Sequence, residues 1–371
     1  MTSRLPAAVQ EYRLCQHCAE RQSGGPEGFE VVGGGACFVC GGLMDRVPAV
    51  AREAAARVKR REFRTFAVGV TFPEGVQERE DELRSDLKSR GSETIKTQAA
   101  RAVALLLGRL ARKKVDKLRP DVTVLADFGT GSVSVSSRSL FYFGRYAKPG
   151  KVSQRRELCH HCSGAGCPKC RNTGFERRPS VEGEVGRRIG SLCGSERVVF
   201  TWLGSEDRES RVYPPGRPFI VEAKNPVKRS LPRGFVARFR GGQVSVTAGR
   251  VLRSKPVGLP KFRFVTRIEC LAAAKVPEER LAELKKAFRR REVSFDRPHV
   301  RPTTKTVYRA RAEARGRKVV VEAELDGGLP VKRFVSGELV SPSVSEVLGT
   351  ELFCRKFDIL KVTQVGLLKL G

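Results

Sequence analysis

A single carboxylate in a short basic turn is the strongest candidate for chemistry in this chain. Asp207 lies in the segment Trp202–Arg211, close to Arg208 and Arg211, and the apolar run Phe219–Val221 follows it. An enzyme that attacks a nucleotide covalently needs a nucleophile with cations nearby, because the carboxylate and the phosphates of the substrate are both negative. The segment therefore predicts a nucleophilic aspartate in a basic groove.

The same segment resembles the catalytic motif of the archaeal and eukaryotic tRNA pseudouridine synthases that modify the TΨC arm. That motif reads approximately G-R-E-D-x-D-x-R, followed by G-R-P-F. Ser205 replaces its first arginine, and Glu209 replaces its second aspartate. The resemblance implies that Asp207 is the nucleophile and that Arg211 and Arg217 bind substrate. The matching positions are Gly204, Glu206, Asp207, Arg211, Gly216, Arg217, Pro218 and Phe219.

Lys332 lies in a second segment that resembles the family. Residues 327–338 match a stretch that reads approximately G-T-Y-I-K-E-L-I-S-G-D, in which Pro330 replaces the tyrosine. The resemblance implies that the Lys332 ammonium pairs with Asp207 and keeps it ionised in a groove of low water content. Without the resemblance, an alternative interpretation is that Lys332 is a surface lysine on a strand edge.

Two aromatic residues are further candidates for contact with substrate. Phe264 lies where the family has a lysine-x-tyrosine strand, and a phenyl ring can stack on uracil. Tyr308 lies near a basic motif of the family, which implies that it lines the RNA. The alternative interpretation of Phe264 is an ordinary phenylalanine of the apolar core.

Most of the eleven cysteines fall in Cys-x-x-Cys pairs. Two pairs near the N-terminus, with glycines between them, predict a zinc ribbon, since each pair forms a knuckle and two knuckles supply four thiolates. The second cluster predicts another metal site, at which His160 and His161 are alternative ligands. One or two structural Zn²⁺ ions are therefore expected, with no redox or organic cofactor. The expected ligands are Cys15, Cys18, Cys37 and Cys40, and then Cys159, Cys162, Cys167 and Cys170.

The elements that follow the first cluster predict an α+β module. Composition and periodicity indicate a β, α, α, β, β, β order that resembles the RNA-binding THUMP-type domain of the same family. The segment 143–148, followed by Ser153 and Gln154, resembles the family's exit from that domain. The expected helices span 48–61, 76–90 and 93–114, and the expected strands 63–70, 121–127, 132–136 and 140–143.

From residue 177 onward, strand composition predominates, and the clearest helix is expected over 277–291. The resemblance implies the mixed-sheet catalytic core of pseudouridine synthases, although the sequence alone allows another α+β fold. The expected fold class is therefore α+β, with a zinc-ribbon segment over 1–47, a THUMP-like domain over 48–150, a Cys-rich linker over 151–176 and a catalytic domain over 177–371.

The composition favours a polyanionic partner. Lys and Arg number 71 against 40 Asp and Glu, which gives a net charge of +31. A membrane is disfavoured because no apolar run approaches the roughly 18 residues that span a bilayer. The absence of a signal-peptide pattern predicts a cytoplasmic location. An arginine-rich thermophilic or halotolerant protein is the alternative explanation of the charge.

Together these features predict a tRNA pseudouridine synthase that isomerises uridine 54 and/or 55 in the TΨC arm, with tRNA as partner and no obligate protein partner. The alternative is a zinc- and THUMP-containing tRNA-binding protein with a catalytically impaired synthase domain. Ser205 and Pro330 favour that alternative, whereas Asp207 and Lys332 favour the enzyme. Another kind of THUMP-containing modification enzyme is disfavoured, because the sequence has neither a methyltransferase glycine loop nor a P-loop.

Overall fold

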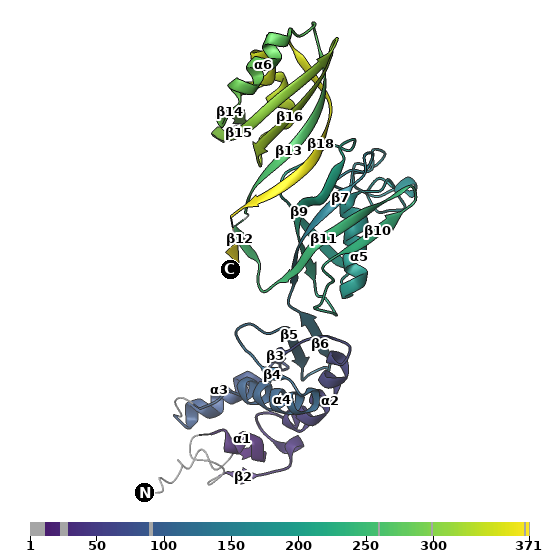
Figure 1. The fold of residues 1–371 in the computed structure, drawn as a ribbon. Coiled ribbons are helices and arrows are strands. Elements are labelled where there is room, and N and C mark those ends of the chain that lie inside the picture. The colour runs from purple at the N-terminus through teal and green to yellow at the C-terminus, as the bar shows by residue number, and fades with distance from the viewer. Residues whose placement is uncertain are drawn as a thin grey trace. The chain divides into compact units, whose positions relative to one another are not determined.

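The structure is a computed structural model that describes residues 12–22, 29–88, 92–258, 260–297, 300–366 and 369–370. The chain forms two compact units, each with its own apolar core (Figure 1). The first unit comprises Met1–Arg138 with Asn225–Arg229, and the second comprises Ser139–Lys224 with Ser230–Gly371. The four-part division predicted from the sequence stays a prediction.

The first unit is built on a four-stranded sheet of order β4-β3-β5-β6. Strand β3 runs parallel to β4 and β5, and β6 is antiparallel to β5. Helix α4 begins where the Thr94 hydroxyl accepts a hydrogen bond from the Thr97 N–H, which caps the helix. The elements are β1 (Arg13–Leu14), α1 (Gln16–Glu20), β2 (Glu30–Val31), α2 (Val47–Val58), β3 (Thr65–Thr71), α3 (Val76–Asp86), α4 (Ile95–Ala111), β4 (Lys114–Val115), β5 (Val122–Asp127) and β6 (Val133–Ser137).

The second unit is built on an eleven-stranded sheet of order β10-β11-β7-β9-β18-β13-β16-β15-β14-β17, in which β8 pairs with β9. Its strands are β7 (Leu140–Lys148), β8 (Arg197–Trp202), β9 (Val212–Lys224), β10 (Phe235–Phe239), β11 (Gly242–Leu252), β13 (Lys261–Ala272), β14 (Arg291–Arg297), β15 (Val300–Arg315), β16 (Lys318–Asp326), β17 (Val340–Ser341) and β18 (Leu352–Val365). The short strands β12 (Pro256–Gly258) and β19 (Lys369–Leu370) pair with each other.

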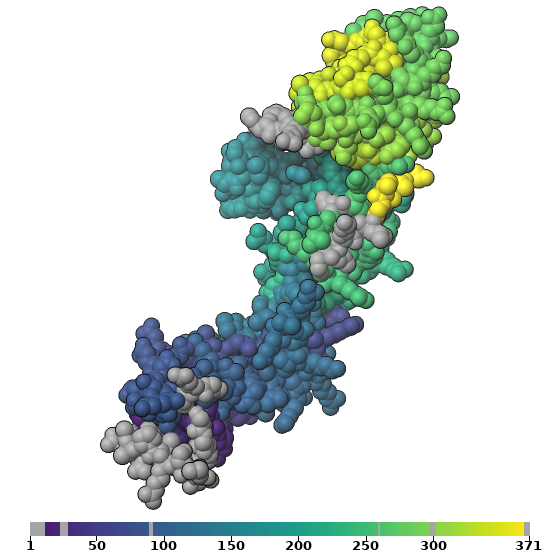
Figure 2. Space-filling view, turned by 90° about the vertical axis from the view of Figure 1, so that its left-hand side faces the viewer, coloured from purple at the N-terminus to yellow at the C-terminus, as the bar shows by residue number. Residues whose placement is uncertain are grey.

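In the described part of this unit, four helices lie on or beside the sheet. Helix α5 (Val181–Cys193) packs on the half that contains β8 to β11, and α6 (Glu278–Ala287) packs on β15. The short helices α7 (Val331–Ser336) and α8 (Val344–Leu348) lie against β18 and α6, respectively. In the space-filling view, the yellow C-terminal segment lies against the green segments of the same half (Figure 2).

The two halves of the large sheet meet at a weak seam. Strands β9 and β18 run parallel and share one register pair, Val212 with Ile359, whereas β13 pairs with β18 along twelve residues. Neighbouring strands elsewhere in this sheet are antiparallel. The seam therefore leaves room between the halves, and the pocket described below opens there.

The predicted α+β class is confirmed, but several elements differ from expectation. The strand expected over 140–143 extends to Lys148 and joins the large sheet, because its backbone pairs with β9 and β11. Lys332 lies in a helix, α7, rather than on a strand edge. The sequence reading also missed α5, α7, α8, β14 and β15. The short helices α7 and α8 and the charged strands have weak periodicity, whereas α5 carries a helical repeat of Val181, Val185 and Ile189 that was not recognised.

Candidate active site and metal clusters

The structure brings Asp207 and Lys332 together. Lys332 Nζ lies 2.8 Å from Oδ2 of Asp207, and their side chains are 56% and 39% exposed. The hydrogen bond with Asp207 raises the pKa of Lys332 above its ordinary value, so its ammonium is charged at neutral pH. The expectation of a groove of low water content is wrong for the protein without RNA, because both side chains still contact solvent.

The residue next to Asp207 lies in the opposite environment. The carboxylate of Glu206 is fully buried, and the Nη1 atom of Arg217 lies 3.1 Å from its Oε2. The Tyr146 hydroxyl donates to Oε1 at 2.5 Å, and the Gln154 amide donates to Oε2 at 3.1 Å. Burial, together with the adjacent Glu206 carboxylate, raises the pKa of Tyr146 well above its ordinary value. Glu206 therefore anchors the segment that carries Asp207.

Arg217 also holds the backbone of this segment. Its guanidinium donates to the carbonyls of Ser205 at 3.1 Å and Leu203 at 3.3 Å. Gly204 has a φ of +94°, and a Cβ atom there would lie 2.1 Å from Nη2 of Arg217, so only glycine fits. Arg217 was expected to bind substrate, but its side chain is 8% exposed and its donors are directed at protein groups.

Lys148 supports the same segment from β7. Its ammonium donates to the carbonyls of Asp207 at 3.3 Å, Arg208 at 3.4 Å and Ser210. The residue is 4% exposed, and this burial lowers its pKa to about 8. A cation thus lies among the carbonyl dipoles behind the Asp207 carboxylate.

The sequence reading did not single out Tyr146, Lys148 or Gln154 as functional. All three lie in or just after the stretch that resembles the family's exit from the THUMP-type domain. The register of β7 against β9 explains their role, because Tyr146 is the direct partner of Arg217. That pairing between distant segments was not visible in the sequence.

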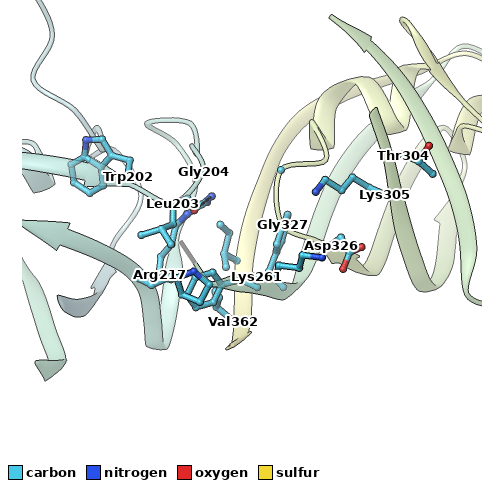
Figure 3. A pocket seen from close by; sticks show the side chains of 16 residues that line it. Trp202, Leu203, Gly204, Arg217, Lys261, Thr304, Lys305, Asp326, Gly327 and Val362 are labelled. Carbon is cyan, nitrogen blue, oxygen red and sulfur yellow. Dashed lines mark hydrogen bonds between the residues drawn. The ribbon is translucent and has the colours of Figure 1, made fainter. Parts of the chain in front are cut away.

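A cavity of about 380 Å³, here called the junction pocket, opens at the seam of the large sheet (Figure 3). Trp202, Leu203 and Gly204 lie on one side, and Lys305 and Asp326 lie on the other. The remaining lining residues are Arg217, Pro218, Pro260, Lys261, Phe262, Phe264, Thr304, Gly327, Gly328, Ile359 and Val362.

The predicted residue Phe264 lines this pocket and is 7% exposed. Phe262, which the sequence reading did not select, lines it as well, because both residues point to the same face of β13. Gly204 precedes Asp207 by three residues and Gly328 precedes Lys332 by four. The pocket therefore offers aromatic walls beside the two segments that carry the ion pair.

Tyr308 and Arg211 do not line the junction pocket. The Tyr308 hydroxyl donates to Oδ1 of Asp326 at 3.0 Å, and the Arg263 guanidinium lies 3.7 Å from the centre of its ring. Tyr308 thus contacts a residue that lines the pocket without lining the pocket itself. Arg211 is exposed, and its backbone N–H donates to Oδ1 of Asp358 at 2.8 Å.

Both cysteine clusters bring four sulfur atoms together. Within each cluster the Sγ atoms lie within 4.8 Å of one another. The Sγ atoms of Cys15 and Cys40 are 3.6 Å apart, and those of Cys159 and Cys167 are 3.9 Å apart. A tetrahedral ion with metal–sulfur bonds of about 2.3 Å requires sulfur atoms roughly 3.8 Å apart. Both clusters therefore fit a metal ion of this size.

Groups around the sulfur atoms support metal binding. The Arg21 guanidinium donates to Cys18 Sγ at 3.6 Å, and Arg21 is also paired with the buried Glu80. In the second cluster, the Gly166 N–H donates to Cys162 Sγ at 3.2 Å. Such donors stabilise thiolates. His160 instead contacts Glu176, so the four thiolates are the better ligand set.

Comparison with known proteins identifies the family. The model described as the archaeal Pus10 THUMP domain matches residues 50–127. The tRNA pseudouridine synthase Pus10 of Korarchaeum cryptofilum is 31% identical over 90% of this chain and 94% of that protein. The chain belongs to the tRNA pseudouridine synthase Pus10 family. The predicted family and the predicted enzyme class, an isomerase that forms pseudouridine in tRNA, are thereby confirmed.

Further Pus10 relatives support this assignment. The protein of Methanothrix thermoacetophila is 32% identical over 88% of this chain and 76% of that protein. The protein of Nitrosopumilus maritimus is 28% identical over 87% of this chain and 84% of that protein. A solved chain in a Cbf5-Nop10-Gar1 complex superposes with a TM-score of 0.30 at 13% identity, over 49% of this chain and 45% of that chain.

The described helices also bear on the membrane question. None of them combines the length and the apolar character needed to cross a membrane.

The THUMP-type module expected from the sequence is confirmed by the family match over residues 50–127.

Proposed function

We propose that this chain converts uridine 54 and/or uridine 55 in the TΨC arm of tRNA to pseudouridine, with Asp207 as the nucleophile. The observation that carries the proposal is the contact between Asp207 Oδ2 and Lys332 Nζ at 2.8 Å. Neither residue lines the junction pocket, but Gly204 and Gly328 of the same two segments do, together with its aromatic walls. Two segments far apart in the sequence, each similar to a motif of the family, supply this pair.

The proposed reaction needs no change of oxidation state. The Asp207 carboxylate attacks C1′ of the target uridine, and the electron pair of the N1–C1′ bond leaves with the base. After the base turns, its C5 atom attacks C1′ and displaces the carboxylate. C5 then loses a proton and N1 gains one, so the product is an isomer of the substrate and Asp207 is regenerated.

Each neighbouring group has a role in this proposal. Lys332 orients the Asp207 carboxylate, and Phe264 with Phe262 forms the wall on which the base turns after it leaves its stack. Arg211 is exposed and free to bind a phosphate of the substrate. Tyr308 acts on the substrate site through Asp326, to which its hydroxyl donates.

A buried layer positions the nucleophile. Arg217 and Glu206 form an ion pair beneath the Asp207 segment, and Lys148 holds three of its carbonyls. Catalysis depends on atoms being held within fractions of an ångström of the reactive geometry. We therefore assign Arg217 a positioning role in place of the substrate-binding role expected from the sequence.

The test is incubation with an unmodified tRNA transcript, followed by carbodiimide-dependent reverse-transcription stops. Stops at uridine 54, uridine 55 or both are expected with the wild-type protein and not with Asp207→Asn. Absence of stops at both positions, with folded wild-type protein that binds the tRNA, would reject the proposal.

The second candidate function is tRNA binding without catalysis. Ser205 and Pro330 favour it, because each replaces a residue that the family motif has. In the structure, Pro330 caps the N-terminus of α7, where proline is tolerated because no N–H is needed. Binding of tRNA by the wild-type protein without any pseudouridine would favour this function.

We also propose that both cysteine clusters hold structural Zn²⁺, one through Cys15, Cys18, Cys37 and Cys40, the other through Cys159, Cys162, Cys167 and Cys170. Metal analysis of protein purified without chelators should give two zinc ions per chain. A value of one after Cys159→Ser, with two in the wild type, would assign the second site. Absence of zinc from the wild-type protein would reject both. The cytoplasmic location stays a prediction.

A further inference from the structure

A hollow beside helix α5 in the second unit carries an excess of arginine. A cavity of about 720 Å³ lies between the segment 170–180 and α5, and a second cavity of about 410 Å³ continues along the helix toward β10. The two cavities share Glu184, Arg187 and Ser191, so they form one continuous surface. We call this surface the α5 groove. Its arginines are Arg156, Arg171, Arg177, Arg178, Arg187, Arg188 and Arg238.

Three of the four carboxylates that line the groove have local partners, and the fourth, Glu196, is exposed. Glu176 accepts from the His160 N–H at 3.0 Å, Glu182 accepts from the Arg156 N–H at 3.0 Å, and Glu184 pairs with Arg187 at 2.7 Å. In contrast, Arg177, Arg178 and Arg188 are exposed, and within the described part of the chain they form no ion pair at 4.0 Å or less. The surface thus presents free guanidinium groups and few free carboxylates.

One guanidinium of the groove is fixed in place. Arg156 stacks on the ring of Phe175, with 3.8 Å between the guanidinium carbon and the ring centre. A stacked guanidinium keeps its N–H edge available and loses less freedom when it binds a phosphate. This end of the groove lies near the Asp207 segment, because Gln154, two residues before Arg156, bonds to Glu206 and to the Gly204 carbonyl.

We propose that the α5 groove binds the phosphate backbone of the RNA whose uridine reaches Asp207. Thirteen residues of α5 span about 20 Å, enough for several consecutive phosphates of one strand. The net charge of +31 supports a polyanion over a partner with scattered acidic groups. The identity of the RNA rests on the proposed function, whereas the groove itself rests on the arginines above.

The test measures tRNA affinity against salt concentration. Each phosphate contact contributes about 0.7 to 0.9 to the slope of log affinity against log salt. In the variant R177Q/R178Q/R188Q we therefore expect the slope to become shallower by about two to three. The matched control is R280Q/R309Q/R311Q, which removes the same charge from three exposed arginines that are paired with Glu283, Glu324 and Glu322. Its slope should change by less than about one.

Two additional measurements keep the result decisive. The variant R177K/R178K/R188K retains the charge and should restore most of the slope, whereas a defect that persists would indicate a structural effect and overturn the proposal. Equal slopes for the glutamine variant and the control would also overturn it. A third outcome would overturn the proposal as well. If the glutamine variant lost binding to poly-glutamate while its tRNA binding stayed unchanged, the groove would serve an acidic protein.

Failure of this proposal differs from failure of the proposed function. Wild-type protein that binds tRNA with a steep salt slope, but forms no pseudouridine, would reject the function and leave the groove intact. Normal pseudouridine formation with an unchanged slope in the glutamine variant would reject the groove alone.

Discussion

The segment Leu203–Arg211 has an inner and an outer side that differ sharply. On the inner side, Glu206 is fully buried and contacts Arg217, Tyr146 and Gln154. On the outer side, its neighbour Asp207 is 39% exposed and pairs with Lys332 alone in the described structure. Two adjacent carboxylates of similar chemistry are thus placed in unlike environments.

This difference separates stability from chemistry. A buried charge with several partners is costly to disturb, because loss of one partner leaves the other uncompensated. An exposed charge contributes little to stability and remains accessible to substrate. The inner side therefore fixes the backbone, and the outer side is free to react. Substitutions on the outer side should lower mainly the rate, whereas substitutions on the inner side should lower stability and, through the position of Asp207, the rate as well.

Asp207→Asn should show the largest effect, and on rate alone. Loss of a covalent nucleophile typically lowers turnover by roughly 10⁴- to 10⁶-fold. The unfolding free energy should change by no more than about 1 kcal/mol, since the ion pair is exposed. Single-turnover formation of pseudouridine and chemical denaturation measure the two quantities. Near-normal turnover would remove Asp207 from the mechanism.

Arg217→Met should instead have its main effect on stability, with a loss of rate that follows from the displaced Asp207 segment. It leaves the Glu206 carboxylate buried without its cation, which costs about 3–5 kcal/mol of stability. The double variant R217M/E206L should recover part of this loss, because the unpaired Glu206 carboxylate is removed as well, whereas the buried Lys148 ammonium loses a neighbouring carboxylate. Arg309→Met, at an exposed pair with Glu324, is the matched control and should cost about 1 kcal/mol or less. Equal costs at both arginines would contradict the inner-side assignment.

The sequence was most informative where chemistry depends on a short local pattern. The Cys-x-x-Cys spacing and the segments around Asp207 and Lys332 indicated residues that the fold does bring together. It was least informative where the site depends on strand register. Tyr146 and Lys148 reach the Asp207 segment because β7 pairs with β9, and such long-range pairing leaves no periodic signal.

Two other differences have separate causes. Alternation along β13 places Phe262 and Phe264 on one face and could have indicated both, but the resemblance to the family singled out Phe264 alone. Arg217 looked like a phosphate ligand because it stands in a basic motif, but burial against Glu206 decides its contacts. Burial of a single arginine on a strand cannot be read from composition.

Lys332→Ala tests the outer side of the segment, and its effect on the rate should be intermediate. A hydrogen bond to a charged group contributes about 1.5–3 kcal/mol, which corresponds to a rate loss of roughly ten- to hundredfold. This is less than the loss expected for a fully buried pair, because Lys332 is 56% exposed before RNA binds. The affinity for tRNA and the unfolding free energy should stay close to wild type. A kinetically silent variant would assign the segment around Lys332 a structural role only.

The smallest effect should come from the ionisation of Lys148. Burial lowers its pKa from 10.5 to about 8, although the surrounding carboxylates of Glu206, Asp358, Glu209 and Asp207 oppose this shift. Between about pH 8 and 10 the unfolded chain therefore binds more protons than the native protein, and the contribution of Lys148 to stability rises with pH. Activity, in contrast, should fall as pH rises. Above about pH 8 the ammonium that holds three carbonyls loses its charge, which loosens the segment that carries Asp207.

Turnover at saturating tRNA should therefore fall roughly three- to tenfold as pH rises through about 8, the effect of weakening one or two hydrogen bonds. Lys148→Met should turn over more slowly at pH 7 and lack this fall, since methionine does not titrate. Lys332 does not contribute to the change, because the hydrogen bond with Asp207 raises its pKa. An equal fall in the Lys148→Met variant would place the titrating group elsewhere. A wild-type profile that stays flat between pH 7 and 9 would show that the neutral amine holds the segment as well as the ammonium does.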